Sequence, residues 1–226
     1  MTCRDCDGAG FVSDGTGAVR RCACDGGATD PLGGIVPERE RRATREECQH
    51  VAELDAALVF MRDGHDVRLV GETGRGKSCI AALMLRDAVG VGAEVGWLNV
   101  PTWLETIRGA MGTSSAQSTM EHVRPDVLVV DDIGAERGTE WELDVVARLL
   151  RLRESSNKLT IATTNLPLDG ERSIRSVYGD RLWSTLGRYR QVVIKGADRR
   201  LERDNETKLT LQERVAARRA KGEANG

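Results

Sequence analysis

Residues 71–78 read GETGRGKS, a glycine-rich stretch whose residue types suit the binding of phosphate. The stretch matches G-x-x-x-x-G-K-[ST] without a gap and follows a short apolar run, as in a loop between a strand and a helix. Glycines let the backbone curl with its N–H groups pointing inward, and the start of the following helix adds partial positive charge. The predicted nucleotide contacts are therefore Gly71, Glu72, Thr73, Gly74, Arg75, Gly76, Lys77, Ser78 and Cys79.

Two residues of this loop have separate predicted tasks. Lys77 is predicted to reach the β and γ phosphates of a bound triphosphate, and the hydroxyl of Ser78 to ligate Mg²⁺. The alternative is a glycine-rich turn that binds no ligand. The complete motif, and its position between a predicted strand and a predicted helix, favour phosphate binding over that alternative.

Four apolar residues, 127–130, lead into two adjacent carboxylates, Asp131 and Asp132. A continuous apolar run is expected of a parallel strand covered on both faces, and ligands bind at the carboxyl ends of such strands. Asp131 is predicted to hold Mg²⁺ through water, and Asp132 to orient or deprotonate the attacking water. An acidic cap on the next helix is the alternative for Asp132.

A further strand, residues 159–164, ends in polar residues and is followed by Asn165. The Asn165 amide is predicted to hydrogen-bond the γ-phosphate or the attacking water, so that the site senses whether this phosphate is present. Because Asn165 precedes Leu166 and Pro167, an ordinary turn residue is the alternative.

Apolar patterns of strand and helix type alternate along the chain. This alternation indicates a three-layer α/β domain, here a P-loop NTPase with a mainly parallel five-stranded sheet. Too few residues follow the last strand for a separate helical lid domain. Strands are expected at residues 68–70, 94–100, 127–130, 159–164 and 191–194, and helices at 51–61, 77–89, 141–153, 181–188 and from Pro101 onward.

Cys3 and Cys6, in CxxC spacing, and Cys22 and Cys24, in CxC spacing, offer four thiolates in two close pairs. Two such pairs suit a closed tetrahedral zinc site, which would order a segment too short to bury a core. An iron–sulfur cluster or a redox pair is the alternative, since the second pair is not CxxC. The predicted segments are a zinc-binding module at 1–28, a linker at 29–45, an ATPase core at 46–200 and a helical or disordered tail at 201–226.

The composition excludes some classes of protein. With 40% hydrophobic residues, 30% charged residues and no apolar run long enough for a membrane span, no membrane partner is expected. The first residues lack the apolar region of a secretory signal, so a cytoplasmic location is expected. A net charge of −2 argues against a wholly basic nucleic-acid coat.

These motifs together resemble the AAA+ ATPases of the ASCE class, and within them the DnaC/IstB-type branch of helicase loaders and transposition helpers. The resemblance covers about residues 36–200. It is carried by GETGRGKS, by VLVVDDIGAE at 127–136, by TIATTNLP at 160–167, by YGDRLWSTL at 178–186 and by VVIKGADRR at 192–200. The stretch IVPERERRAT at 35–44 is similar to the segment that precedes the core in this branch.

The resemblance implies Walker A roles for Lys77 and Ser78, Walker B roles for Asp131 and Asp132, and a sensor 1 role for Asn165. It also implies a sensor 2 role for Arg200. One departure is Thr185, which stands where the branch usually carries an arginine finger. Arg181 and Arg188 lie four residues before and three after Thr185, so either is a candidate finger if this segment is helical. A surface arginine paired with an acid is the alternative for each.

By resemblance, the expected function is an ATP-dependent replicative helicase loader. Its expected partners are a replicative helicase, single-stranded DNA and further copies of the chain, which ATP would bring together, and its expected cofactors are ATP, Mg²⁺ and Zn²⁺. An IstB-type transposition helper is the alternative within this class. An alternative of another class is a zinc-containing DNA-binding adaptor that holds ATP as a static switch.

Overall fold

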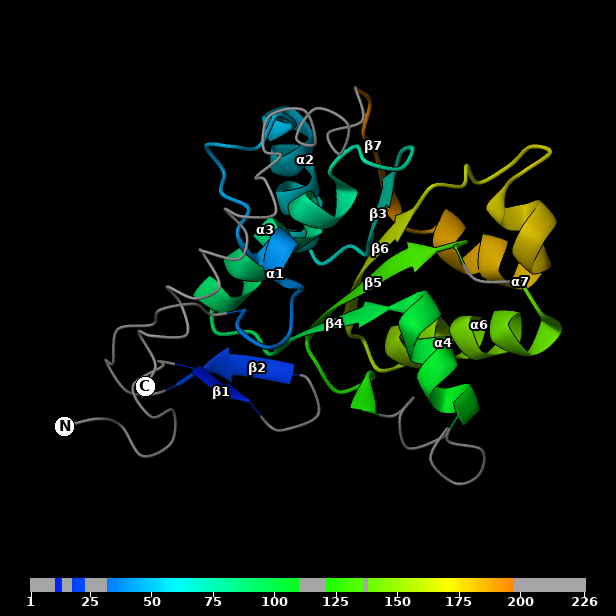
Figure 1. Cartoon of the computed structure of the whole chain (residues 1–226), viewed down its shortest axis with the longest axis horizontal. Helices are drawn as coiled ribbons and strands as arrows, with labels where there is room; N and C mark the ends of the chain where they lie inside the picture. The colour runs from blue at the N-terminus through cyan, green and yellow to red at the C-terminus, as the bar shows by residue number, and fades with distance from the viewer. Residues whose placement is uncertain (1–10, 14–17, 23–31, 110–120, 136–137, 197–226) are drawn as a thin grey trace, which may run out of the picture.

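A computed structural model describes residues 11–13, 18–22, 32–109, 121–135 and 138–196. Its sheet has five parallel strands in the order β4-β5-β6-β3-β7 (Figure 1). The mainly parallel five-stranded sheet expected from the sequence is thereby confirmed. The strands are β3 (Val67–Val70), β4 (Val95–Asn99), β5 (Val127–Ile133), β6 (Leu159–Thr164) and β7 (Arg190–Val193).

Helices cover both faces of this sheet and give the expected three layers. Along β5, Val127 and Val129 belong to one buried apolar cluster, and Leu128 and Val130 belong to another. Successive side chains of a strand point to opposite faces, so each face has its own core. One cluster includes α2 (Val51–Arg62) and α3 (Lys77–Gly90); the other includes α4 (Val100–Gly109), α6 (Glu140–Ser155) and α7 (Ile174–Gly187).

Two short strands lengthen the sheet beyond β4. The hairpin of β1 (Phe11–Ser13) and β2 (Ala18–Arg21) is antiparallel, and β2 pairs antiparallel with β4 through Ala18 with Gly96. Part of the segment expected as an N-terminal module therefore shares the sheet of the ATPase core. The hairpin pairs Phe11 with Arg21, so the chain enters and leaves it at the end that carries Cys22.

The segment expected as a linker, 29–45, is packed against the core where the structure describes it. Leu32 and Val36 are 0% and 4% exposed and join the apolar cluster under α2 and α3. The short helix α1 (Glu38–Arg41) follows them. These two apolar side chains explain why the segment is held in place despite its glycines and prolines.

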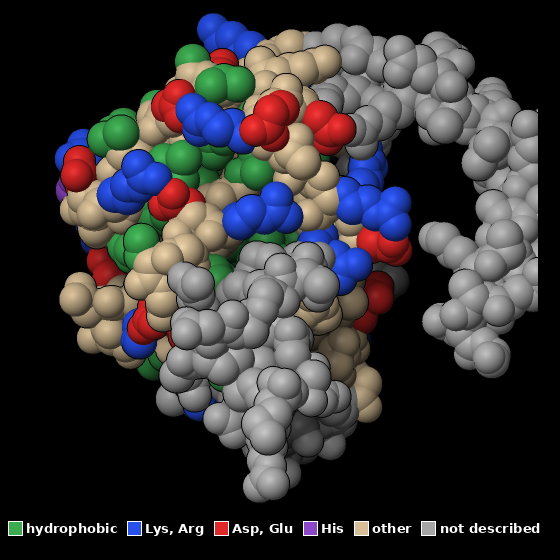
Figure 2. Space-filling model, turned by 90° about the vertical axis from the view of Figure 1, so that its left-hand side faces the viewer, with side chains coloured by type: hydrophobic (Ala, Val, Ile, Leu, Met, Phe, Trp, Pro, Cys, Tyr) green, Lys and Arg blue, Asp and Glu red, His purple; other side chains and the backbone are tan. Residues whose placement is uncertain are grey.

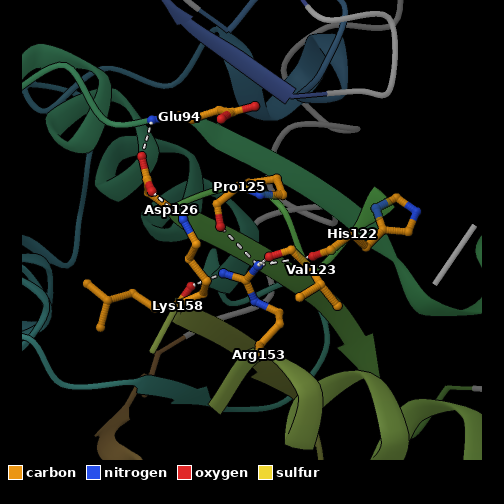
Figure 3. Close-up of polar contacts among 8 residues, drawn as sticks. Glu94, His122, Val123, Pro125, Asp126, Arg153 and Lys158 are labelled. Carbon is orange, nitrogen blue, oxygen red and sulfur yellow. Dashed lines mark hydrogen bonds and ion pairs between the residues drawn. The ribbon is translucent and has the colours of Figure 1, made fainter. Parts of the chain in front are cut away.

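Arg153 of α6, which is 0% exposed, connects the amino ends of β5 and β6 (Figure 3). Burial lowers the pKa of its guanidinium to about 10. Every nitrogen of the guanidinium donates a hydrogen bond, as a buried charge requires. Its acceptors are the Thr160 hydroxyl at 3.1 Å and the carbonyl oxygens of His122 at 3.0 Å, Val123 at 3.2 Å, Pro125 at 3.1 Å and Leu159.

The expected helix at 181–188 forms the second half of α7, which is kinked at Gly179, where φ is +71°. A positive φ is favourable for glycine because it has no Cβ. Residues 201–226, expected as a helical or disordered tail, lie outside the described residues. No helix in the described part of the chain combines the length and the apolar character needed to cross a membrane.

Candidate nucleotide-binding site

The glycine-rich loop lies between β3 and α3, as the sequence predicts, and two of its glycines hold left-handed conformations. The φ angles of Gly74 and Gly76 are +80° and +86°, and Gly76 is the residue before the first turn of α3. At Gly71 a Cβ atom would lie 2.5 Å from the carbonyl oxygen of Ile194. The loop path therefore depends on glycine at these three positions.

The Lys77 side chain joins the loop to the neighbouring strand. Its Nζ donates hydrogen bonds to the carbonyl oxygens of Gly71 at 2.7 Å and Glu72 at 2.9 Å, and to Asn165 Oδ1 at 2.6 Å. The residue is only 5% exposed, so its charge depends on these acceptors. Asn165 in turn donates from Nδ2 to Thr73 Oγ1 at 3.2 Å. The structure thus brings the predicted sensor residue onto the predicted phosphate loop.

Ser78 and Asp131 also meet, as a shared Mg²⁺ site requires. Ser78 Oγ donates to Asp131 Oδ1 at 3.0 Å, and Thr163 Oγ1 donates to the same oxygen at 2.7 Å. A hydroxyl beside a carboxylate is the donor set by which P-loop proteins hold Mg²⁺. Thr163 is not among the predicted site residues; the sequence signal for it is the pair of threonines, Thr163 and Thr164, at the carboxyl end of β6.

Burial, together with the neighbouring charge of Asp132, raises the pKa of Asp131 to about 6, although the hydrogen bonds from Thr163 and Ser78 oppose the shift. Asp132 has a left-handed backbone conformation with a φ of +62°, and the two consecutive carboxylates have different surroundings. Asp131 is 5% exposed, whereas Asp132 is half-buried and lines the cavity beside the loop. Its backbone N–H donates to Thr163 Oγ1 at 2.9 Å, which helps to hold this uncommon conformation.

Two adjoining cavities follow the loop. A cavity of about 50 Å³ is lined by Thr73, Gly74, Gly76, Lys77, Ser78, Cys79, Asp132, Asn165, Arg39 and Glu40. A second, of about 580 Å³, lies between α3 and residues 38–50 and shares Arg39, Gly76 and Cys79 with the first. Small polar space beside a larger, partly apolar space suits the phosphates and the base of one nucleotide.

Several residues of the segment 38–50 line these cavities, although none of them is among the predicted nucleotide contacts. Arg39 and Glu40 line the phosphate cavity from α1, far from the loop in sequence. The half-buried thiols of Cys48 and Cys79 both line the larger cavity. The packing of Leu32 and Val36 in the core helps to hold this segment beside the loop, and neither residue belongs to a phosphate motif.

The candidate finger residues have different surroundings. Arg181 is exposed, and no described residue forms a hydrogen bond or ion pair with its side chain. Arg188 is paired with Glu154 at 2.7 Å. Thr185, at the position where a finger was expected, is 3% exposed and donates to the Arg181 carbonyl oxygen at 3.3 Å. Arg75, within the loop, is paired with Glu72, and Arg200 lies outside the described residues.

The cysteines of the predicted zinc site are only partly described. Cys22 is 6% exposed at the end of β2, whereas Cys3, Cys6 and Cys24 lie outside the described residues. Among the described residues there is no group of three or more His, Cys, Asp and Glu side chains that could hold a metal ion.

The sheet order, the glycine loop and the acidic strand end define an α/β P-loop NTPase fold of the AAA+ type. A protein-family model described as IstB-like ATP binding protein matches residues 38–187, more than half of the chain. The chain therefore belongs to the IstB-like ATP-binding protein family.

Relatives within reach of sequence comparison include proteins of two kinds. An ATP-binding protein of insertion sequence IS1162 from Pseudomonas fluorescens is 31% identical over 133 residues, which are 58% of this chain and 57% of that protein. The replicative helicase loader DnaC of Escherichia coli is 26% identical over 159 residues, 65% of this chain and 61% of that protein. The chain thus spans about three fifths of the length of these curated relatives.

Solved structures share the fold at low sequence identity. A crystal structure of DnaI aligns with a TM-score of 0.57 at 19% identity over 72% of this chain and 93% of that one. The DnaC helicase loader aligns with a TM-score of 0.56 at 21% identity over 70% of this chain and 100% of that one. At sequence identities this low, the similarity to these structures supports a shared fold and nothing more specific.

The raised pKa of Asp131 predicts a pH-dependent cost to folding. At pH values between 3.8, the ordinary pKa of an aspartate, and about 6, Asp131 keeps a proton in the folded chain that it releases in the unfolded chain. The free energy of unfolding should therefore fall by about 2–3 kcal/mol between about pH 4 and 7, and Asp131→Asn should remove this fall. Urea unfolding without nucleotide or Mg²⁺, at several pH values, measures the difference between the two proteins.

The matched control is Asp144→Asn, an exposed carboxylate on α6 for which no described residue forms an ion pair. This variant should keep the pH dependence of the unsubstituted protein. If the free energy of unfolding changed with pH by the same amount in Asp131→Asn and in the unsubstituted protein, the prediction that buried Asp131 binds a proton in this range would be wrong.

Proposed function

We propose that the chain is a Mg²⁺-dependent ATPase whose nucleotide state controls its assembly with itself and with a DNA-bound partner. The observation that carries the proposal is the convergence of three motifs on one cavity: Lys77 contacts Asn165, and Ser78 contacts Asp131. These motifs are far apart in sequence, so their meeting supports a common ligand rather than three separate structural roles. Membership of an ATP-binding family supports ATP as that ligand.

The residues of the site divide the work of hydrolysis. Lys77 has all three ammonium protons in hydrogen bonds, so a phosphate oxygen would replace one of its present acceptors. Ser78 and Asp131 would hold Mg²⁺, which when bound offsets the charge of the phosphates. Asp132 lines the cavity and would orient the attacking water, and Asn165 would lose its bond to Lys77 when a γ-phosphate arrives.

Replacing Lys77 with alanine tests the nucleotide-binding role. Lys77→Ala should abolish MgATP binding in calorimetry and abolish ATP-promoted self-association in sedimentation. The reason is that Lys77 carries the only ammonium group among the described residues that line the phosphate cavity. Lys158→Ala is the matched control, since Lys158 lies at the amino ends of the strands and pairs with Asp126. MgATP binding by Lys77→Ala at the unsubstituted affinity would sink the proposal.

Neighbouring copies are proposed to complete the site with Arg181. Its side chain is exposed without an ion pair among the described residues, whereas Arg188 is paired with Glu154. An arginine that stabilises the charge of phosphoryl transfer contributes about 10³-fold or more in rate. Arg181→Ala should therefore lose most hydrolysis but keep MgATP binding, and Arg188→Ala should lose much less.

A mixing experiment distinguishes a contribution to the neighbour from an effect within one chain. Lys77→Ala and Arg181→Ala proteins should each be inactive alone, yet a mixture pairs an intact loop with an intact arginine. Phosphate release by the mixture above the sum of the two variants is the expected result. Additive, near-zero rates would mean that Arg181 does not act on an adjacent copy.

The partner is proposed to be a replicative helicase loaded onto single-stranded DNA, as the name of the DnaC relative suggests. The insertion-sequence relative supports a transposition helper as the second candidate. On the face of the molecule drawn in Figure 2, acidic and basic side chains are interspersed over its described part. A DNA contact on that part would therefore use local groups of charge rather than a continuous basic track.

Phosphate release with different additions separates these candidates. A loader should be stimulated by single-stranded DNA together with the replicative helicase of the source cells, and a transposition helper by the matching transposase instead. Absence of turnover in every mixture, with ATP still bound, would favour a DNA-binding adaptor in which ATP is a static switch.

A zinc ion held by Cys3, Cys6, Cys22 and Cys24 remains part of the proposal. The register of the β1–β2 hairpin supports this site, because it places the first and last residues of the hairpin, Phe11 and Arg21, opposite each other. In sequence, one cysteine pair precedes Phe11 and the other follows Arg21. Four thiolates suit a closed structural zinc site. The purified protein should contain about one zinc ion per chain by mass spectrometry, and Cys22→Ser should lose it. Cys48→Ser is the control; iron in place of zinc would contradict the proposal.

A further inference from the structure

We infer that Arg39, from the short helix α1, binds the α-phosphate of the nucleotide on the wall opposite the glycine loop. The inference rests on the nucleotide-binding function proposed above and adds to it a residue outside the phosphate motifs. Arg39 lies in the segment before the ATPase core, 38 positions ahead of Lys77 along the chain.

The position of Arg39 in the two cavities identifies the part of the nucleotide that it faces. Arg39 lines both the phosphate cavity and the larger cavity, and it shares this property with Gly76 and Cys79. Lys77, Asp132 and Asn165 line only the phosphate cavity, so the far phosphates belong there. A nucleotide that places its base in the larger cavity passes the junction with its ribose and α-phosphate.

The charge of Arg39 is available to a ligand. Its neighbours are engaged: Arg42 pairs with Glu38, and Arg45 pairs with Asp55 at 2.6 Å. No described residue forms an ion pair or hydrogen bond with the Arg39 side chain. A guanidinium presents several N–H groups in a planar fork that matches a phosphate, so an unengaged arginine beside a phosphate loop is chemically suited to that ligand.

The backbone that carries Arg39 is held in place by the helix that carries Lys77. Arg86 of α3 donates from Nη1 to the Ala43 carbonyl oxygen at 2.9 Å and from Nη2 to the Arg41 carbonyl oxygen at 2.7 Å. Figure 1 shows α1 beside α3, with which it is in contact. Leu32 and Val36 anchor the chain just before α1 in the core. Arg39 therefore has a fixed starting point, which lowers the cost of ordering its side chain on a ligand.

A series of ligands that differ only in phosphates tests the assignment. Displacement of a fluorescent ADP analogue gives affinities for adenosine, AMP, ADP and ATP with the full chain and with Arg39→Gln. The variant should bind AMP, ADP and ATP about 10- to 100-fold more weakly, by the same factor for all three, because a charge-assisted hydrogen bond to a shared phosphate is lost. Adenosine should bind both proteins equally.

Two further variants keep the result specific. Arg45→Gln removes a nearby arginine that is paired with Asp55 and lines neither cavity, so all four affinities should stay unchanged. Arg39→Lys keeps the charge without the planar fork and should fall between the two. The melting temperature of Arg39→Gln without nucleotide should equal that of the unsubstituted protein, since the side chain has no partner to lose among the described residues.

Several outcomes would overturn the assignment. Equal affinities of Arg39→Gln and the unsubstituted protein for all three phosphorylated ligands would remove Arg39 from the site. A loss confined to ATP would place the contact at the γ-phosphate, and an equal loss for adenosine would place it at the base or ribose. If the unsubstituted protein bound none of the nucleotides, the proposed ATPase function itself would fail.

Discussion

The site depends on one buried ammonium group. Lys77 is almost fully buried, and its three protons are accepted by two carbonyl oxygens of the loop and by Asn165 of the adjacent strand end. A cation removed from water must be matched by acceptors or it destabilises the fold. The loop conformation, the end of β6 and the position of α3 are therefore coupled through one side chain, and a phosphate that binds there must alter all three.

The sheet supplies the rigid frame for that coupling. Parallel pairing of β5 with β6 sets Asp131 beside Thr163, and pairing of β3 with β6 sets the loop beside Asn165. At the opposite ends of these strands, Arg153 donates hydrogen bonds to carbonyl oxygens at the amino ends of β5 and β6. Arg153 thus stabilises the amino ends of these strands, and the carboxyl ends present polar side chains to a ligand.

Local patterns predicted the sheet, and they placed the motif residues at the strand and helix ends where the structure has them. The loop sequence and the apolar run before Asp131 are contiguous signals, and both lie where strand and helix periodicity placed them. Contacts made by packing of distant segments could not be predicted in this way. Arg39 lines the cavity because its segment is held beside α3 by the burial of Leu32 and Val36 and by hydrogen bonds from Arg86. The hairpin of β1 and β2 joins the sheet through two residue pairs with β4. The interior position of Thr185, which is 3% exposed, likewise follows from packing and has no signal in the local sequence.

The central claim is that a triphosphate exchanges places with Asn165 at the Lys77 ammonium. A crystal structure of the protein with Mg²⁺ and a non-hydrolysable ATP analogue tests it most directly. We expect the phosphates against the loop, a phosphate oxygen within hydrogen-bond distance of Lys77 Nζ, and Asn165 turned from Lys77 toward the γ-phosphate. An analogue bound elsewhere, with the Lys77–Asn165 contact intact, would contradict the account.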